Sequence, residues 1–323
     1  MYQQLFQQRR LMPISLLALG LSGALVLALP TKAQNPAPAP VAAETPAAKT
    51  GPRDPAAFEG YWSKGQAEIT SYTLEQARYG EMHPGQAVLI FVTEDLSARR
   101  QVKLDRPEMA GEDRVRVLKL NLTKKFATGV YPYSMMASVF TPLDLSGSLK
   151  MTASIQEWCG QVFVQLNRRA EGLKIELRSY FESEGDQNKT LTDMVLEDDV
   201  WTRLRLDPAS LETGIVEILP SMLYLRLAHR PITPYAARAT MTPAGGDGIA
   251  SYMLEYPEFQ RTLTIRYRAA FPYEIESWEE KYPDGRGGPM LTTKAVRKER
   301  LMLDYWNHNA KVDEPLRKRL GIE

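Results

Sequence analysis

Residues 173–181 read LKIELRSYF, and apolar and polar side chains alternate along this stretch. Leu173, Ile175 and Leu177 fall on one side of an extended chain, whereas Lys174 and Glu176 fall on the other. Alternation with a period of two is typical of a β-strand that has one buried and one solvated face. The same pattern recurs in residues 223–227 and 263–267, so these segments are predicted to be strands as well.

Short turn sequences separate many such segments, which indicates hairpins rather than helical crossovers. They are HPG at 83–85, EG at 171–172, GGDG at 245–248 and PDG at 283–285. Further strands are expected at 67–79, 86–93, 100–104, 135–140, 150–157, 161–167, 252–256, 273–280 and 292–305. In residues 114–123 the apolar phase slips between Val117 and Leu118, which predicts a β-bulge.

Helix is expected in few places. Residues 191–206 show near-helical apolar spacing that ends at Asp207-Pro208, and a short tail helix is expected from Pro315. The predicted helix divides the strands into a first β group (59–190), a helical connection (191–210) and a second β group (211–323). The predicted fold is therefore mainly all-β: an antiparallel meander forming a barrel, a half-barrel or two packed curved sheets.

Composition excludes several classes of protein. The chain has 323 residues, with 40 Lys and Arg against 39 Asp and Glu. Without Arg9, Arg10 and Lys32 of residues 1–33, the counts are 37 and 39, a charge of −2. This balance argues against nucleic-acid binding, which depends on cations that neutralise phosphates. A single cysteine and three histidines argue against a disulfide scaffold and a Cys-rich metal site.

The N-terminal part has the pattern of an export signal. A basic pair, Arg9-Arg10, precedes an apolar run at 11–29, and small residues at Thr31 and Ala33 offer a cleavage site. An uncleaved membrane anchor is the alternative. Residues 34–58 are rich in Pro and Ala and are expected to form an extended linker. We therefore expect export to the periplasm or cell envelope.

Cys159 is a candidate reactive thiol, which would need a base such as His83, His229 or His308 close to it in the fold. A small buried apolar residue is the alternative interpretation of this cysteine. Carboxylate pairs for hydrolysis would have to converge from distant strands, and no sequence feature selects a pair. No cofactor is expected.

Two acidic segments stand out in the sequence. Residues 182–188 place oxygen ligands at every second position, as a calcium loop does, but the glycine is at the fourth position, and an acidic turn is favoured. Residues 197–199, EDD, are interpreted as a solvated helix face. No metal ligands are therefore predicted.

Aromatic and methionine side chains gather in residues 131–140. Such residues can line an adaptable apolar pocket, and they also pack ordinary cores. The predicted ligand-binding set is Tyr131, Tyr133, Met135, Met136 and Phe140. The aromatic pairs Tyr61-Trp62 and Tyr305-Trp306, near the two ends of the folded part, are expected to seal the seam of a closing sheet.

Several segments resemble a group of uncharacterised exported bacterial proteins. They are residues 91–97 (FVTEDLS), 101–104 (QVKL), 131–136 (YPYSMM), 156–161 (QEWCGQ) and 179–186 (SYFESEGD). Some members of this group carry the name septum formation inhibitor Maf. Maf proteins have a Ser-x-Ser-Pro-Arg-Arg-type motif, and the nearest match here, Ser97-Ala98-Arg99-Arg100, lacks its first serine and its proline. Nucleotide chemistry is therefore not expected.

Three functions remain open from the sequence. We expect a non-enzymatic envelope protein that binds a lipid, another apolar small molecule or a protein partner. A hydrolase that uses carboxylates or Cys159, and a structural scaffold, are the alternatives. Membrane contact is expected at most through an uncleaved N-terminal segment.

Overall fold

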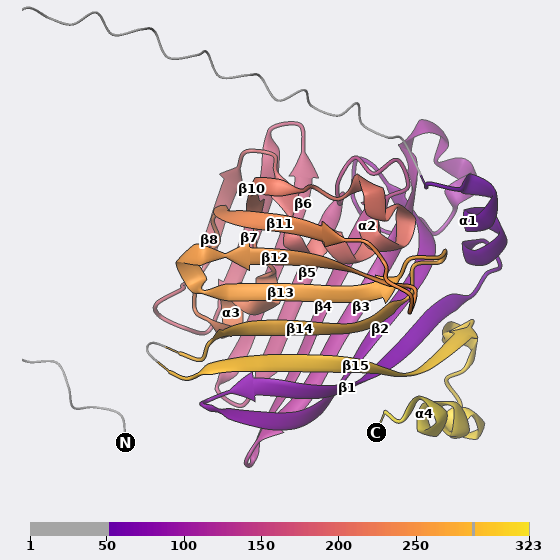
Figure 1. Cartoon of the computed structure of the whole chain (residues 1–323). Helices are drawn as coiled ribbons and strands as arrows, with labels where there is room; N and C mark the ends of the chain where they lie inside the picture. The colour runs from indigo at the N-terminus through magenta and orange to yellow at the C-terminus, as the bar shows by residue number, and fades with distance from the viewer. Residues whose placement is uncertain (1–51, 286–287, 323) are drawn as a thin grey trace, which may run out of the picture. The chain divides into compact units, whose positions relative to one another are not determined.

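The computed structural model describes residues 52–285 and 288–322, so the expected signal at 1–33 and most of the expected linker lie outside it. In the described residues, fifteen strands form one sheet (Figure 1). They are β1 (Ala67–Arg78), β2 (Glu81–Ser97), β3 (Arg114–Thr128), β4 (Tyr131–Pro142), β5 (Lys150–Glu157), β6 (Gly160–Arg169), β7 (Gly172–Ser179), β8 (Gln187–Leu191), β9 (Val195–Leu196), β10 (Gly214–Leu219), β11 (Tyr235–Thr242), β12 (Ile249–Tyr256), β13 (Arg261–Arg268), β14 (Ile275–Pro283) and β15 (Met290–Leu303).

Four short α-helices and several 3-10 turns accompany the sheet. The helices are α1 (Pro55–Trp62), α2 (Val200–Leu206), α3 (Met222–Leu227) and α4 (Glu314–Leu320). The 3-10 turns are η1 (Pro107–Met109), η2 (Gly111–Asp113), η3 (Glu197–Asp199), η4 (Pro208–Ser210), η5 (Pro257–Phe259), η6 (Tyr305–Asn307) and η7 (Lys311–Asp313).

The first strand, β1, lies in the interior of the sheet, between β2 and β15, and the other strands follow on each side as a meander. The order is β8-β7-β6-β5-β4-β3-β2-β1-β15-β14-β13-β12-β11-β10-β9. All neighbours pair antiparallel except β9 and β10, which are parallel. The prediction of a mainly β antiparallel meander is confirmed. The sheet is open, since β8 and β9 are its two end strands, and both predicted strand groups belong to this one sheet.

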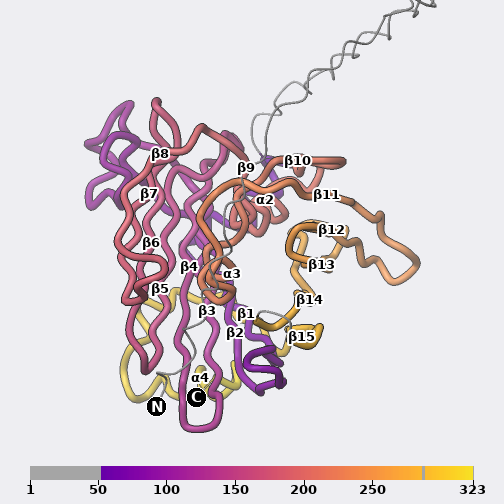
Figure 2. The backbone as a smooth tube through the Cα atoms, turned by 90° about the vertical axis from the view of Figure 1, so that its left-hand side faces the viewer, coloured from indigo at the N-terminus to yellow at the C-terminus, as the bar shows by residue number. Residues whose placement is uncertain are grey.

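The two faces of the sheet bury different elements. Figure 2 shows β4–β7 and β11–β14 on opposite sides of α2 and α3, which therefore lie on the inner side of the curve. The main apolar core fills this inner side, and α1 contributes Phe58 and Trp62 to it. On the outer face, Leu316 and Leu320 of α4 pack near Val88 and Leu301 of β2 and β15.

The helix predicted at 191–206 is only partly present. Leu191 ends β8 and pairs with Leu173 of β7, and Val195–Leu196 pair with β10. The helix α2 begins at Val200 and ends before Asp207-Pro208, as the sequence indicates. The ladder partners of residues 191–196 are distant in sequence, so local apolar spacing does not reveal them.

Residues 223–227 were wrongly predicted to be a strand. They form α3, in which all six residues are buried, Tyr224 and Arg226 included. Alternation of apolar and polar residues predicts a strand only where one face is buried and the other is solvated. Helix α3 is covered on every side, so its alternating leucines do not predict its secondary structure.

The β2 region also differs from the prediction. The expected turn at 83–85 lies within β2, and the chain reverses instead at Tyr79-Gly80, where φ is 55° and 80°. Gly85 is needed for close packing, because a Cβ there would lie 2.5 Å from the carbonyl oxygen of Lys125. Residues 100–104 make one isolated bridge rather than a strand.

Two further expectations are corrected. The register of β3 runs without a shift through Val117 and Leu118, so no bulge lies there, and both residues are buried because both faces of the strand are covered. The expected linker ends earlier than residue 58. Helix α1 starts at Pro55, capped by the Asp54 side chain, and Phe58 is buried.

Candidate functional site

The segment that connects β8 to β11 carries buried charges, and its helices α2 and α3 lie on the inner side of the curved sheet (Figure 2). Three arginine–glutamate pairs fix this segment, residues 195–227, to the strands. The N···O distances are 2.6 and 2.7 Å for Arg205–Glu68, 2.6 and 2.5 Å for Arg261–Glu197, and 2.5 Å for Arg226–Glu157. Burial alone would raise the pKa of Glu68, but the Arg205 guanidinium holds that pKa below its ordinary value. The Arg205–Glu68 pair therefore stays ionised in the interior.

A second cluster of charged groups surrounds Arg261. Its Nε donates to Glu280 at 2.8 Å, and Lys124 Nζ lies 3.9 Å from the same carboxylate. Asp198 is also buried here, where burial and then the charge of Glu197 raise its pKa to about 7. The cavity between these groups measures about 30 Å³, enough for a single water molecule. It cannot admit a substrate, so this cluster positions the segment rather than performing chemistry.

An apolar pocket of about 150 Å³ lies between the inner face of the sheet and α3. Its walls are aliphatic and come from β6, β7, α3 and the residues that follow α3: Val162, Val164, Leu177, Met222, Leu225 and Ile232. Pro231 and six polar residues complete the lining: Ser183, Glu184, Gln187, Arg226, His229 and Arg230. Apolar walls with a few convergent polar groups are the usual construction of a small-molecule site.

The polar groups of the pocket bond to one another. His229 Nδ1 lies 2.8 Å from Glu184, and Arg226 Nη1 lies 3.3 Å from His229 Nε2. Burial would raise the pKa of Glu184, but its bonds with His229 and Ser179 leave that pKa below its ordinary value. The Arg226 guanidinium also lies 4.0 Å from the centroid of the Phe181 ring. These contacts fix the polar groups in place around the pocket.

This arrangement is not a catalytic triad. Ser183 lines the same pocket, but the ring nitrogen of His229 that would act as a base faces Arg226. With Nδ1 toward Glu184 and Nε2 toward a guanidinium donor, neither nitrogen is directed at a serine hydroxyl. The geometry therefore lacks the serine–histidine hydrogen bond of a catalytic triad.

The five residues predicted to bind a ligand do not share a face. Tyr131, Tyr133 and Met135 point inward from β4, whereas Met136 and Phe140 point outward, because side chains alternate along a strand. None of the five lines the apolar pocket. Tyr133 stacks on Phe126 with a centroid distance of 4.6 Å, and so belongs to the core. Burial raises the pKa of Tyr131, and its hydroxyl donates to Glu157 at 3.2 Å.

Cys159 is exposed in the turn between β5 and β6. Its backbone N–H donates to the Tyr131 hydroxyl at 2.9 Å. The three histidines bond elsewhere: His83 to the carbonyl of Arg78, His229 to Glu184, and His308 to Asp304 and Asp313. The structure therefore does not bring the thiol and an imidazole base together.

The acidic segments have structural roles. In the turn at 182–188, Glu184 accepts from the Ser179 hydroxyl at 2.7 Å, and Asp186 accepts from the backbone N–H of Ser179 at 3.1 Å. Across the described part of the chain, no group of three or more His, Cys, Asp and Glu side chains could hold a metal ion. Residues Glu197–Asp199 are buried, so their interpretation as a solvated face is wrong.

Sequence reasoning missed the residues of the pocket. Val162, Val164 and Leu177 lie in predicted strands, but the pocket also needs α3, which was read as a strand. One signal was present: Arg226 interrupts a leucine-rich run, and a lone charge in such a run requires a buried partner. The expected aromatic seal is only partly buried, since Trp62 lies in the core and Trp306 is exposed.

In the residues that the structure describes, no helix has the length and apolar character required to cross a membrane. No protein-family model and no curated protein matches the chain. Among solved structures, the chain is similar to a beta-barrel-like protein of a domain of unknown function, DUF1849, from Brucella abortus. The similarity has 9% sequence identity and a TM-score of 0.44, and it covers 79% of this chain and 99% of that chain.

Proposed function

We propose that this protein is an exported, non-enzymatic binding protein that holds the apolar part of a ligand between β6, β7 and α3. The observation that carries the proposal is the pocket of about 150 Å³ with aliphatic walls on two sides. Cavities of about this volume with aliphatic walls bind groups the size of benzene. The pocket therefore suits one ring or a short stretch of acyl chain, with the rest of the ligand passing the polar groups.

The charges around the pocket favour an uncharged ligand part. Arg226 and Arg230 contribute two positive charges, and Glu157 and Glu184 contribute two negative charges. These four charges balance one another, so an added ionised group would lack a counter-charge. Hydrogen-bond acceptors such as an ester or amide carbonyl suit the guanidinium and imidazole donors better.

Binding is tested with the neutral fluorescent probe N-phenyl-1-naphthylamine. The wild-type chain is expected to bind it saturably, and Val164→Phe, which fills the pocket, is expected to weaken binding at least tenfold. Ile215→Phe, at an exposed position on β10, is the matched control and should bind as the wild type does. Circular dichroism establishes that each variant is folded, since overpacking costs about 1–3 kcal/mol. Equal probe affinity in folded Val164→Phe would contradict the proposal.

Export and the absence of catalysis are tested separately. The basic and apolar pattern of residues 1–33 supports export, and the N-terminal sequence of protein from the cell envelope is expected to begin at Gln34. The hydrolase alternative would require Cys159 or a carboxylate pair. It would gain support if Cys159→Ser removed an activity of the purified protein on ester substrates.

A further inference from the structure

One end of the sheet carries exposed apolar side chains on successive turns. We name it the hairpin end; it comprises the turns after β1, β3 and β5, the residues directly after β7 and the first residues of β2 and β15. The exposed fractions are 60% for Tyr79, 79% for Val130, 66% for Trp158 and 66% for Tyr180. Met82 and Met290 lie at the same end and are 40% and 42% exposed. The ladders place these turns together, because β1 to β7 are neighbours in order.

Such residues are unusual in tight turns, where Gly, Asn and Asp predominate. Tyr79 occupies a turn position with φ of 55°, a left-handed conformation that is uncommon for an aromatic residue. Its hydroxyl bonds that of Tyr133 at 2.7 Å, and Arg78 lies 4.5 Å from its ring centroid, so the exposed ring is held in a fixed position. The exposed ring is thus a built feature of this turn.

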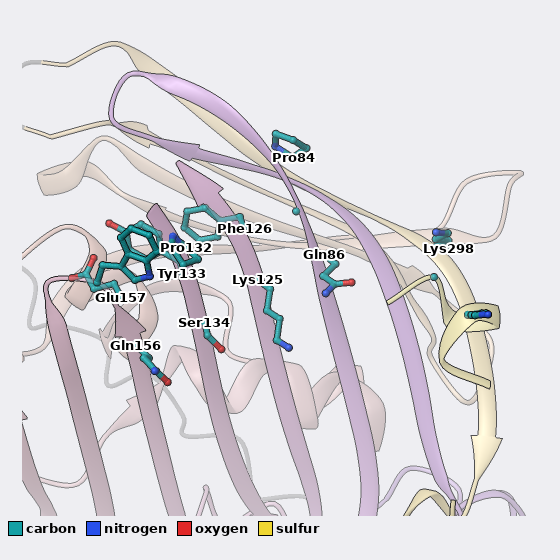
Figure 3. Close-up of a pocket in the computed structure, with 14 residues that line it drawn as sticks. Pro84, Gln86, Lys125, Phe126, Pro132, Tyr133, Ser134, Gln156, Glu157 and Lys298 are labelled. Atoms are coloured by element: carbon teal, nitrogen blue, oxygen red, sulfur yellow. The ribbon is translucent and has the colours of Figure 1, made fainter. Parts of the chain in front are cut away.

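A cationic groove adjoins the hairpin end on the outer face of the sheet. It measures about 930 Å³, and Lys125, Lys298 and Lys318 line it together with Trp158 of the hairpin end. Gln86, Lys125, Ser134 and Gln156 are successive cross-strand partners and form one polar row along the groove (Figure 3). Glu157 also borders the groove, but its carboxylate pairs with Arg226 on the inner side.

The opposite end of the sheet has a different character. The loop after β2 and the residues after β15 lie there, and Trp306 is exposed among Asp304, His308 and Asp313. A matched pair of exposed tryptophans, Trp158 and Trp306, thus marks the two ends of one sheet.

We infer that the hairpin end docks onto an anionic lipid surface, with the apolar tips at the level of the headgroups and the lysines of the groove against lipid phosphates. Aromatic rings are favoured at the membrane interface, and lysine side chains reach past apolar surface toward phosphate. The charges of the groove favour an anionic lipid, because three of the four ionised groups that line it are cations and the fourth, Glu157, is paired with Arg226. The inference does not rest on the proposed ligand pocket.

The test uses the full chain and vesicles that carry a nitroxide label on a fraction of the lipid headgroups, since a nitroxide quenches tryptophan at short distance. The vesicles contain phosphatidylcholine alone or mixed with phosphatidylglycerol. Quenching is expected to be several-fold greater with phosphatidylglycerol and to fall as salt is added. Residues 1–51 contain no tryptophan, so any attachment through the N-terminal segment does not contribute to this readout.

Variants assign the signal to one end of the molecule. Trp158→Phe is expected to remove most of the quenching, whereas Trp306→Phe should leave it unchanged. Replacing Lys125, Lys298 and Lys318 by Gln is expected to abolish the difference between the two vesicle types. Lys64→Gln with Arg99→Gln and Lys103→Gln, cations at the opposite end, is the matched control.

Val130→Ser keeps all tryptophans and alters only one exposed tip, so it is expected to reduce the quenching of Trp158 in a folded protein. Equal loss in Trp158→Phe and Trp306→Phe would overturn the inference. Equal quenching on both vesicle types, or none on either, would do the same. Val164→Phe distinguishes the two proposals. If it loses probe binding but its tryptophan quenching by vesicles is unchanged, lipid docking does not depend on the ligand pocket.

Discussion

Two buried regions of this protein are stabilised in different ways. The inner face of β6 and β7 is mainly aliphatic, with Arg168 at one end beside Asp199, whereas the connecting segment 195–227 buries many charged side chains against the strands. The inner aliphatic residues of β6 and β7 are Val162, Val164, Leu166, Leu173, Ile175 and Leu177. The buried ionisable residues of the segment are Glu197, Asp198, Asp199, Arg205, Asp207 and Arg226.

The difference shows how a segment that is mostly outside the strand ladders acquires a fixed position. A strand is positioned by its backbone bonds and its register, and its apolar face only has to be covered. In the segment 195–227 only β9 and β10 pair with other strands, at the edge of the sheet. The residues between and after them form short helices and turns, and arginine–glutamate pairs that reach β1, β5 and β13 fix those residues in place. Ion pairs with bidentate geometry define direction as well as distance.

The largest expected effect comes from breaking one buried pair on one side. Arg261→Leu leaves Glu197 and Glu280 buried without their guanidinium partner. The free energy of unfolding is expected to fall by about 3–5 kcal/mol, as measured by urea denaturation. Arg266→Leu, on the outer face of the same strand, removes a half-exposed pair with Glu279 and should cost less than about 1 kcal/mol. Equal costs for both variants would show that the buried pairs do not fix the segment.

A smaller effect is expected on the aliphatic side. Leu166 is fully buried and pairs with Ile175 of β7 and Met151 of β5. Leu166→Ala is expected to lower the free energy of unfolding by about 3 kcal/mol, because it removes apolar contacts and leaves a cavity. The loss should be the same at pH 5 and pH 8, since no ionisable group is removed. If the stability lost in Leu166→Ala changes with pH, the aliphatic face of β6 and β7 is coupled to the ionisable groups of the segment 195–227.

The third effect is a pH dependence of the segment itself. The pKa of Asp198 is raised to about 7 in the folded state, so the folded protein retains this proton up to a higher pH than the unfolded chain. The stabilisation is fully present below the unfolded pKa, near 3.9, and is lost as the pH rises through the folded pKa.

Between pH 5 and pH 8 this loss amounts to about 2–3 kcal/mol. Asp198→Asn cannot ionise and still accepts the backbone N–H of Met222, so it should lack this component. Urea denaturation of both proteins across this pH range measures the difference. Parallel pH profiles would contradict a protonated Asp198.

The sequence predicts the structure of β6 and β7 far better than that of the segment 195–227. In residues 173–177 the alternation, the strand and the buried face agree, because one face of that strand meets the core. Residues 197–199 are acidic, and the partner of Glu197 is Arg261, 64 residues away. Arg205 and Glu68 are separated by 137 residues. Long-range pairs leave no local pattern, so these acids resembled a solvated face.

The candidate site was hidden for the same reason. One wall of the pocket comes from β6 and β7, which the sequence predicts correctly as strands. The other wall is α3, whose alternating leucines wrongly predict a strand. The aromatic cluster at 131–140 drew attention because of its composition, yet the pleat divides it between two faces. Its inward rings fill the core, and a pocket arises only where α3 leaves space beside β6 and β7.

The pairing of β1 with β15 has a consequence for the nascent chain. The Ser71 hydroxyl donates to the carbonyl of Glu299, 228 residues later, so one edge of β1 has no partner until almost the whole chain has been made. At synthesis rates of about 5–20 residues per second, that edge stays open for roughly 10–45 seconds. An open strand edge is a template for pairing with other chains, so aggregation threatens this protein most before its last strand emerges from the ribosome.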